Sequence, residues 1–226
     1  MISFNEALGL VLAEALPLPP EEAPPLAALG RVCAASVLSP EDLPAWDRSL
    51  MDGFAVQSSE VSSASASSPV RLKIVADLPA GREHAGAVGA GECVRIMTGA
   101  FIPCGCDAVV MREDVADEGG GVIIKAPTAA GRNVRRKGGD LGKGDAVVPA
   151  GKRVGPADIC ALVSAMIPSV SVVRRPVVAI LSTGDEQVGA VPGPGKIPAS
   201  SSAALEAQAL EACALPLRIG VVKDRL

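Results

Sequence analysis

Three loops in the sequence combine acidic or hydroxyl side chains with glycine, a combination that can hold phosphate groups or a divalent cation. The first loop, SLMDGFA, places Asp52 and Gly53 at a predicted turn between two apolar anchors. The second has Thr98 and Gly99 between two strand-like runs, where a hydroxyl group and free backbone N–H groups can face an anion. Both motifs also have a purely structural interpretation, because Asp-Gly is common in turns and glycines often only shape a long hairpin loop.

The third loop, ILSTGDE, follows a predicted parallel strand at its carboxyl end, where open α/β sheets bind ligands. Its Ser182, Thr183 and Gly184 can donate hydrogen bonds to a phosphate group. Its Asp185 and Glu186 can bind a divalent cation through carboxylate oxygens. The loop lacks the Gly-x-x-x-x-Gly-Lys-Ser/Thr pattern of a Walker loop, and its position favours a functional role.

A basic segment lies between the second and third loops, at residues 131–145. Four basic residues, among them Arg135 and Arg136, occupy six positions and are followed by Gly-Gly-Asp140. The segment can bind an anion through its guanidinium groups and a metal through its carboxylates. A run of solvated charged side chains is the alternative interpretation.

The composition argues against several classes of function. The chain has 226 residues and a net charge of −4, so it lacks the overall positive field that draws proteins to nucleic acids or membranes. Aromatic residues make up 2% of the chain, which leaves few side chains for stacking on single-stranded nucleic acid. A single histidine, His84, and scattered cysteines do not form a zinc motif, and Cys104 and Cys106 are expected to be small buried thiols. Without a secretory signal or a long apolar stretch, the protein is expected to be cytoplasmic.

Helical and α/β patterns mark the two ends of the chain. The apolar spacing predicts a helix over residues 3–16, with Ser3 and Glu6 at capping-box spacing, and another over 156–167. The strand VVAILSTG, a helix near 202–213 and the strand LRIGVVKD then form a βαβ unit, which is typical of a parallel sheet. One such unit leaves much apolar surface uncovered, so the sequence is expected to end inside an α/β domain.

The middle of the chain has a different pattern. Between about 70 and 150, short β-rich runs punctuated by glycine predict a small all-β unit. The segment 117–121 is a predicted hairpin turn, and the Ser/Ala-rich stretch 57–69 is expected to be a loop.

Taken together, these motifs resemble one family. Four strings occur in the same order in MoeA proteins and in the matching domain of gephyrin: SLMDGFA, RIMTGAFIPCGCDAVV, NVRRKGGD and the segment from Arg-Arg-Pro at 174–176 to Ser-Thr-Gly-Asp-Glu at 182–186. The resemblance covers essentially all 226 residues, and TGA-x-IP-x-G-x-DAVV is its most specific string. The sequence is therefore similar to the N-terminal part of a MoeA-type molybdopterin molybdenumtransferase.

The resemblance implies an elongated multidomain chain that combines α/β and all-β parts. An N-terminal α/β segment is expected at residues 1–39 and 143–173, interrupted by an inserted β domain at 40–142. A parallel α/β domain similar to MogA is expected to start at 174 and to be incomplete at 226. In the family, a further β domain follows.

The resemblance also implies an active site at a cleft between the two subunits of a homodimer. Asp52, Thr98, Asp140 and Glu186 match active-site positions of the family. The implied reaction inserts molybdate into adenylylated molybdopterin and releases AMP. Other proteins of molybdenum cofactor biosynthesis are further expected partners.

The expected substrates are anionic, so carboxylates alone would repel them. Mg²⁺ bound by Asp52 and Glu186 would offset that repulsion and orient the adenylyl bond. Arg135 and Arg136 would attract the oxyanion.

The sequence departs from the family pattern at several positions. A serine in the segment 197–202 replaces an expected asparagine, and Met166 replaces an expected glycine. The Gly-Gly-x-Ser-x-Gly loop, later lysine and aspartate positions and the C-terminal domain are missing. A truncated, non-catalytic homologue that acts as a dimerising or cofactor-binding module is therefore the alternative. A general phosphate-binding α/β protein is a third interpretation, and it accounts only for residues 176–226.

Overall fold

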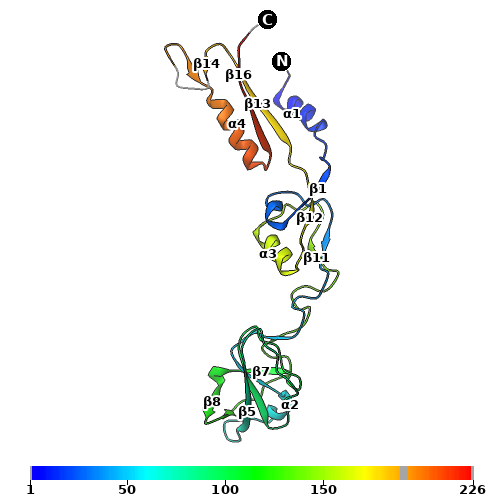
Figure 1. Cartoon of the computed structure of the whole chain (residues 1–226), viewed down its shortest axis with the longest axis vertical. Helices are drawn as coiled ribbons and strands as arrows, with labels where there is room; N and C mark the ends of the chain where they lie inside the picture. Colours follow the sequence, from blue (N-terminus) through cyan, green and yellow to red (C-terminus); the bar gives the residue numbers. More distant parts are fainter. Residues whose placement is uncertain (1, 189–192, 225–226) are drawn as a thin grey trace. The chain divides into compact units, whose positions relative to one another are not determined.

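The computed structural model describes residues 2–188 and 193–224, and the parts of the predicted 174–226 segment at 189–192 and 225–226 lie outside the described residues. The chain divides into two compact units (Figure 1). One consists of the ranges Met1–Val37 and Ala146–Leu226, and the other is the continuous range Leu38–Asp145. The second unit is therefore an insertion in the first.

The inserted unit is built on a six-stranded sheet with the strand order β7-β4-β6-β5-β9-β8. Strands β5 and β6 pair in parallel, whereas the other neighbours are antiparallel, so the sheet is mixed. The strands are β4 (Gly53–Val56), β5 (Val70–Leu78), β6 (Glu92–Ile96), β7 (Ala108–Met111), β8 (Val115–Glu118) and β9 (Gly121–Ile124).

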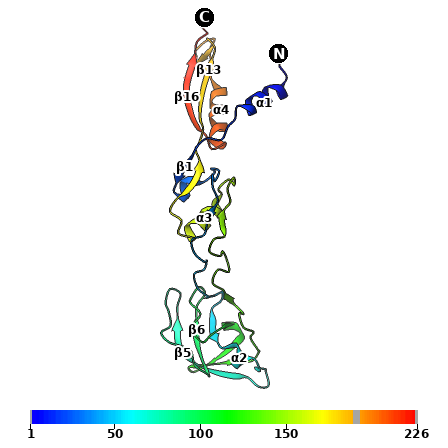
Figure 2. The ribbon, with the colours of Figure 1, turned by 90° about the vertical axis from the view of Figure 1, so that its right-hand side faces the viewer.

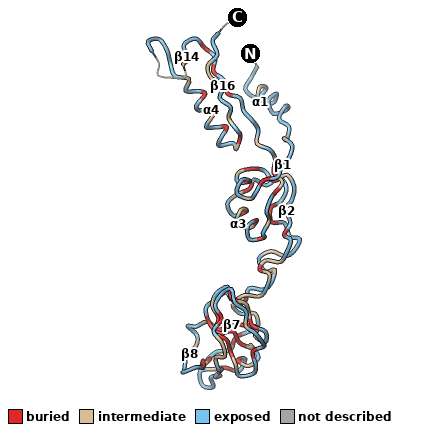
Figure 3. Tube along the Cα trace, in the orientation of Figure 1, coloured by how far each residue is buried: buried red, intermediate tan, exposed pale blue. Residues whose placement is uncertain are grey.

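Both faces of this sheet are covered by apolar side chains. Phe54 and Val56 belong to one core cluster, whereas Ala55, between them, belongs to the other. Because successive strand residues point to opposite faces, this alternation shows that β4 is buried on both sides. Figure 3 shows buried residues gathered in this unit.

The sequence-based prediction of this unit was correct for the hairpin and incomplete elsewhere. The predicted turn at 117–121 is confirmed, since β8 and β9 pair across Gly119 and Gly120. Strand β4 was missed because its first residues were assigned to a turn. The last predicted strand of the run is β11 (Ala146–Val148), which pairs with β2 (Val37–Leu38) and does not join the six-stranded sheet.

The expectation of a loop at 57–69 was wrong at its start, where α2 (Ser58–Val61) forms a short helix. The carboxylate of Asp107 accepts hydrogen bonds from the backbone N–H and the hydroxyl group of Ser58, both at 2.7 Å. A carboxylate at a helix N-terminus satisfies donors that have no partner within the helix. This cap is distant in sequence, so local composition could not reveal it.

The first unit begins with α1 (Phe4–Ala13), whose predicted capping box is confirmed by bonds between Ser3 and Glu6 in both directions. None of its residues is buried. Next come β1 (Pro20–Ala23) and a 3-10 helix, η1 (Pro25–Ala28). Strand β1 pairs antiparallel with β12 (Val170–Val173), and α3 (Pro156–Ser164) confirms the second predicted helix.

One departure from the family pattern, Met166, lies in this unit. Met166 follows α3 with φ +53°, a conformation that glycine adopts without the steric cost that a Cβ atom brings. The residue is exposed, so only its backbone conformation distinguishes this position. Glycine is expected at this position because it adopts a positive φ without strain, whereas methionine adopts it at a steric cost.

The predicted βαβ unit is confirmed. Strand β13 (Val177–Thr183) pairs in parallel with β16 (Leu215–Val222), and α4 (Ser200–Glu211) connects them. Figure 2 shows α4 alongside both strands. The short strands β14 (Gln187–Val188) and β15 (Ile197–Pro198) pair in parallel near the end of β13. Among the described residues, no helix is long and apolar enough to cross a membrane.

Substituting Gly53 with alanine should destabilise the inserted unit by at least about 2 kcal/mol, because an overpacked core site forces backbone shifts. A Cβ atom at Gly53 would lie 2.0 Å from the carbonyl oxygen of Val110 in β7, which is a backbone atom and cannot rotate away. Chemical denaturation monitored by circular dichroism measures the change. Gly89→Ala is the control, since its nearest contact is the end of the flexible Glu92 side chain. Equal stability of the two variants would contradict the prediction.

Candidate functional site

The structure brings together two of the predicted site residues, Asp52 and Thr98. Oδ1 of Asp52 accepts hydrogen bonds from the backbone N–H of Thr98 at 2.7 Å and from its hydroxyl group at 2.8 Å. These two bonds, the backbone bond first, hold the pKa of the Asp52 carboxyl below its ordinary value, with a smaller contribution from Arg112. The carboxylate is therefore ionised and fixed in orientation.

The two loops are also joined through their backbones. The N–H of Gly99 donates to the carbonyl oxygen of Ser49 at 2.8 Å, and the N–H of Ser49 donates to the carbonyl oxygen of Ala100 at 2.9 Å. The expectation of free N–H groups at Thr98 and Gly99 was therefore wrong, because the chain itself supplies their acceptors. Gly99 has φ +83°, which explains why glycine occupies this turn.

The basic segment lies against the first loop as well. Strand β10 (Val134–Arg135) pairs antiparallel with β3 (Arg48–Ser49), and the N–H of Leu50 donates to the carbonyl oxygen of Asn133 at 2.9 Å. Three segments distant in sequence thus meet around residues 48–52. This part of the predicted site is a single assembly within the inserted unit.

Asp140 lies in an ion-paired cluster. Its Oδ2 accepts a hydrogen bond from Arg48 at 3.1 Å, and its Oδ1 pairs with Arg135. Two predicted site residues, Asp140 and Arg135, are therefore in contact with each other. The Asp140 carboxylate pairs with the guanidinium groups of Arg48 and Arg135, so it can fix the orientation of both.

Arg136 and Lys137 are also paired within the chain. Asp47 accepts a hydrogen bond from Arg136 at 2.6 Å and another from the backbone N–H of Lys137 at 2.8 Å. Burial works to raise the pKa of Asp47, but the Lys137 N–H and the Arg136 guanidinium outweigh it, so the pKa lies below its ordinary value. The predicted positive charge of this segment is thus largely compensated.

Asp47 and Arg48 were missed by the sequence analysis. Both precede the SLMDGFA string and have charges opposite to their partners at 135–140. Charge complementarity between two distant segments is the signal that could have identified them. Pairing cannot be assigned from sequence alone, because each charge has many candidate partners.

The third loop lies in the other unit, after β13. Ser182 is buried and its hydroxyl group contacts that of Ser202 in α4. Gly184 has φ +134°, and a Cβ atom there would lie 2.7 Å from the carboxylate oxygens of Glu186. Thr183, Asp185 and Glu186 are exposed. The loop therefore presents two carboxylates and one hydroxyl group at the carboxyl end of a parallel strand.

The predicted metal ligands have suitable donor chemistry. Within residues 2–188 and 193–224, no group of three or more His, Cys, Asp or Glu side chains is arranged to hold a metal ion. Mg²⁺ commonly uses only one or two carboxylates and completes its shell with water and phosphate oxygens. The exposed carboxylates of Asp185 and Glu186 fit that requirement, whereas Oδ1 of Asp52 is engaged by Thr98.

Comparison with known proteins shows the family to which the chain belongs. Residues 2–165 match the family model described as the MoeA N-terminal region (domain I and II). The chain belongs to the MoeA family. This MoeA-family chain is 40% identical over 200 residues to the molybdopterin molybdenumtransferase of Nostoc sp., and 39% identical over 204 residues to that of Bacillus subtilis. In both comparisons 88% of this chain is covered, against 46% and 47% of the relatives, so it spans about half their length.

Solved structures of MoeA proteins have the same fold. A molybdopterin biosynthesis MoeA protein from Pyrococcus horikoshii OT3 has a TM-score of 0.89 and 30% sequence identity, and the match covers 100% of this chain and 61% of that one. A second crystal structure from the same organism gives a TM-score of 0.77 at 36% identity, covering 99% and 58%. The fold of this MoeA-family chain is therefore represented in longer MoeA proteins.

Replacing Thr98 with valine should raise the pKa of Asp52 in this MoeA-family chain. The substitution removes the hydroxyl donor but keeps the backbone N–H, so the pKa should move toward its ordinary value without reaching it. An NMR titration of the carboxyl carbon would measure the shift. Thr128→Val is the control, because the hydrogen bonds to the Asp52 carboxylate come from Thr98 and not from Thr128. An unchanged Asp52 titration in Thr98→Val would exclude the hydroxyl group as a partner.

Proposed function

We propose that this chain acts in molybdenum cofactor biosynthesis, in the insertion of molybdate into adenylylated molybdopterin with release of AMP. The observation that carries the proposal is the assembly of Asp52, Thr98 and Asp140 by the same loops whose sequences define the resemblance. Membership of the MoeA family and relatives named molybdopterin molybdenumtransferase support it. The activity is proposed for a cytoplasmic homodimer.

Each residue has a distinct role in this proposal. The ionised Asp52 carboxylate, oriented by Thr98, would face the reacting centre and accept a hydrogen bond. Asp140 would hold Arg135 in a fixed direction, toward an oxyanion. Arg136 would contribute less charge because Asp47 already pairs with it.

The loop after β13 would bind the phosphate groups. The hydroxyl group of Thr183 would donate a hydrogen bond, while Ser182 would position the loop through Ser202. The N–H of Gly184, expected from the sequence to be a donor, already donates to the carbonyl oxygen of Val222 at 3.2 Å. Asp185 and Glu186 would hold Mg²⁺, which when bound offsets the charge of phosphate oxygens and polarises them. Asp52 is proposed as a further ligand through its second oxygen.

A non-catalytic module is the second candidate function. It would keep dimerisation or cofactor binding and would interact with other proteins of the pathway. The observation in its favour is that basic residues of the site are compensated within the chain. Binding without turnover would distinguish it from the enzyme.

Asp52→Asn and Glu186→Gln should each reduce AMP release by about a hundredfold or more, a size typical of losing a charged group at a reacting centre. The assay contains this chain, adenylylated molybdopterin, molybdate and Mg²⁺. Asp77→Asn is the matched control, since Asp77 is an exposed carboxylate whose ion-pair contact, to Arg95, is long at 3.9 Å. Wild-type turnover in Asp52→Asn would remove Asp52 from the mechanism. Ligand binding without AMP release by the unmodified chain would favour the non-catalytic module.

Sedimentation should show a dimer at tens of micromolar, because α1 exposes Phe4, Leu8 and Leu12 and buries none of its residues. Replacing Leu8 and Leu12 with serine should shift the chain toward monomer. The same change at Leu205 and Leu210, exposed on α4, is the control. A monomer in the unmodified protein would contradict the proposed homodimer.

A further inference from the structure

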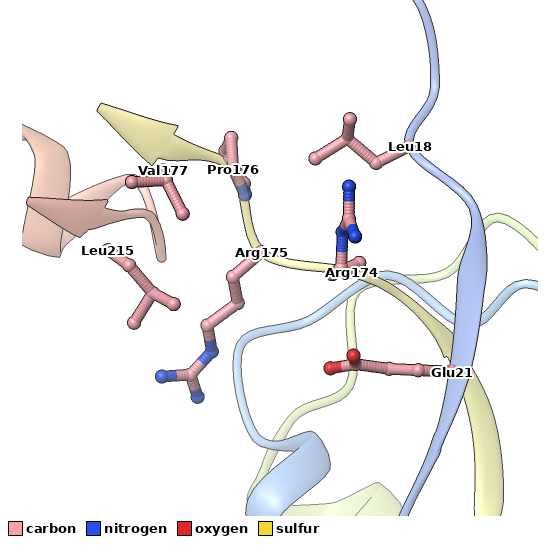
Figure 4. Close-up of a pocket in the computed structure, with 7 residues that line it drawn as sticks. All are labelled: Leu18, Glu21, Arg174, Arg175, Pro176, Val177 and Leu215. Atoms are coloured by element: carbon pink, nitrogen blue, oxygen red, sulfur yellow. The ribbon is translucent and has the colours of Figure 1, made fainter. Parts of the chain in front are cut away.

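Two adjoining cavities lie at the start of β13, at the opposite end of that strand from the Ser182–Glu186 loop. Strand β13 has seven residues and spans roughly 20 Å. The larger cavity, of about 550 Å³, is shown in Figure 4, and the smaller one is about 110 Å³. They share Arg174, Arg175 and Pro176 as lining residues.

The smaller cavity is lined by guanidinium groups that have unused donors. Arg31 has a side chain only 7% exposed, and it pairs with Glu21 and donates to the carbonyl oxygen of Val173 at 3.1 Å. Its Nε is buried and has no acceptor among the described residues, and the same holds for Nε of Arg175. A buried N–H without an acceptor is unfavourable, so two such groups on residues that line one cavity favour an anionic ligand.

The balance of charge in this region is positive. Among the described residues, Glu21 is the one carboxylate that lines the larger cavity, and Arg31 neutralises it. Arg174 and Arg175 form no ion pair with any described residue. Arg153 adds a further positive charge nearby, since it donates to the carbonyl oxygen of Gly30, which also lines the smaller cavity, at 2.8 Å.

The larger cavity adds an apolar surface to this charge. Figure 4 shows Leu18 on one side and Val177 and Leu215 on the other, with Arg174 directed toward Leu18 and Arg175 extending the opposite way. The backbone is fixed on both sides, because Arg174 N–H donates to Pro19 at 3.1 Å and Leu215 N–H donates to Pro176 at 2.8 Å. The two cavities together thus offer a charged pocket and an apolar one.

We propose that these cavities bind a small organic phosphate monoester, with the phosphate against Arg31 and Arg175 and the apolar body against Leu18, Val177 and Leu215. A phosphate has several acceptor oxygens in different directions, which suits guanidinium groups that approach from different elements. A cavity of about 110 Å³ accommodates a phosphate group. This site does not depend on the proposed molybdenum chemistry. Apart from the segment 174–177, its residues lie outside the four strings that carry the family resemblance.

Calorimetry and NMR test the proposal, with phenyl phosphate and inorganic phosphate as probes. Phenyl phosphate should bind saturably with one site per chain and about tenfold more tightly than inorganic phosphate, because only the ester contacts the apolar surface. Arg175→Gln should weaken its binding by about tenfold, a loss equivalent to about 1.4 kcal/mol. Arg174→Gln, at an exposed side chain, gives a second variant with little risk to folding.

Arg218→Gln is the matched control, because it removes one exposed arginine from the same unit outside both cavities. Methyl shifts of Leu18, Val177 and Leu215 should change on binding, while signals of the Ser182–Glu186 loop should not. Four results would overturn the proposal: no saturable binding, equal affinity for the two probes, equal losses in Arg175→Gln and Arg218→Gln, or shifts confined to the Ser182–Glu186 loop. The last result would assign the phosphate to the proposed active-site loop and leave the proposed function intact.

Discussion

The contact between Gly53 and the backbone of β7 is the constraint on which the inserted unit depends. Strand β4 lies between β7 and β6 and is buried on both faces, and its first residue approaches the Val110 carbonyl so closely that no Cβ atom fits. Asp52 immediately precedes that residue. The backbone carbonyl oxygen of Asp52 accepts a hydrogen bond from the backbone N–H of Arg112, just beyond β7, at 3.1 Å. The position of the Asp52 carboxylate is therefore set by sheet packing, and Thr98 fixes its orientation.

The charged side chains around the candidate site of the same unit are paired with one another. Arg48 and Arg135 flank Asp140, and Asp47 joins the side chain of Arg136 to the backbone of Lys137. Exposed ion pairs of this kind contribute little to stability individually, because solvent screens them and the side chains lose entropy. Their main effect is geometric, since each pair restricts the directions that a guanidinium group can take. A site that must orient an oxyanion benefits from such restriction more than from additional charge.

The sequence predicts local elements well and long-range partners poorly, for physical reasons. The capping box of α1, the hairpin at 117–121 and the βαβ unit depend on residues close in sequence, so composition and spacing are sufficient. Helix α2 depends on Asp107, and β4 depends on neighbours on both sides, neither of which spacing reveals. The same division applies to the candidate site. Asp52 and Thr98 were identified individually, but the mutual contact that lowers the Asp52 pKa appears only in the fold.

The departures from the family pattern can be weighed by what each position requires of its residue. Met166 occupies a left-handed conformation that costs a non-glycine residue roughly 1–2 kcal/mol, but its side chain is exposed. The serines at 200–202 form the first turn of α4. Ser200 and Ser201 are exposed, whereas Ser202 is buried against Ser182. A side-chain change at either exposed position leaves the contact between Ser202 and Ser182 in place, and this contact joins α4 to the end of β13. The departures in the described residues therefore affect local backbone energy and the loop surface, and they leave the elements that position Asp52, Thr98 and Glu186 in place.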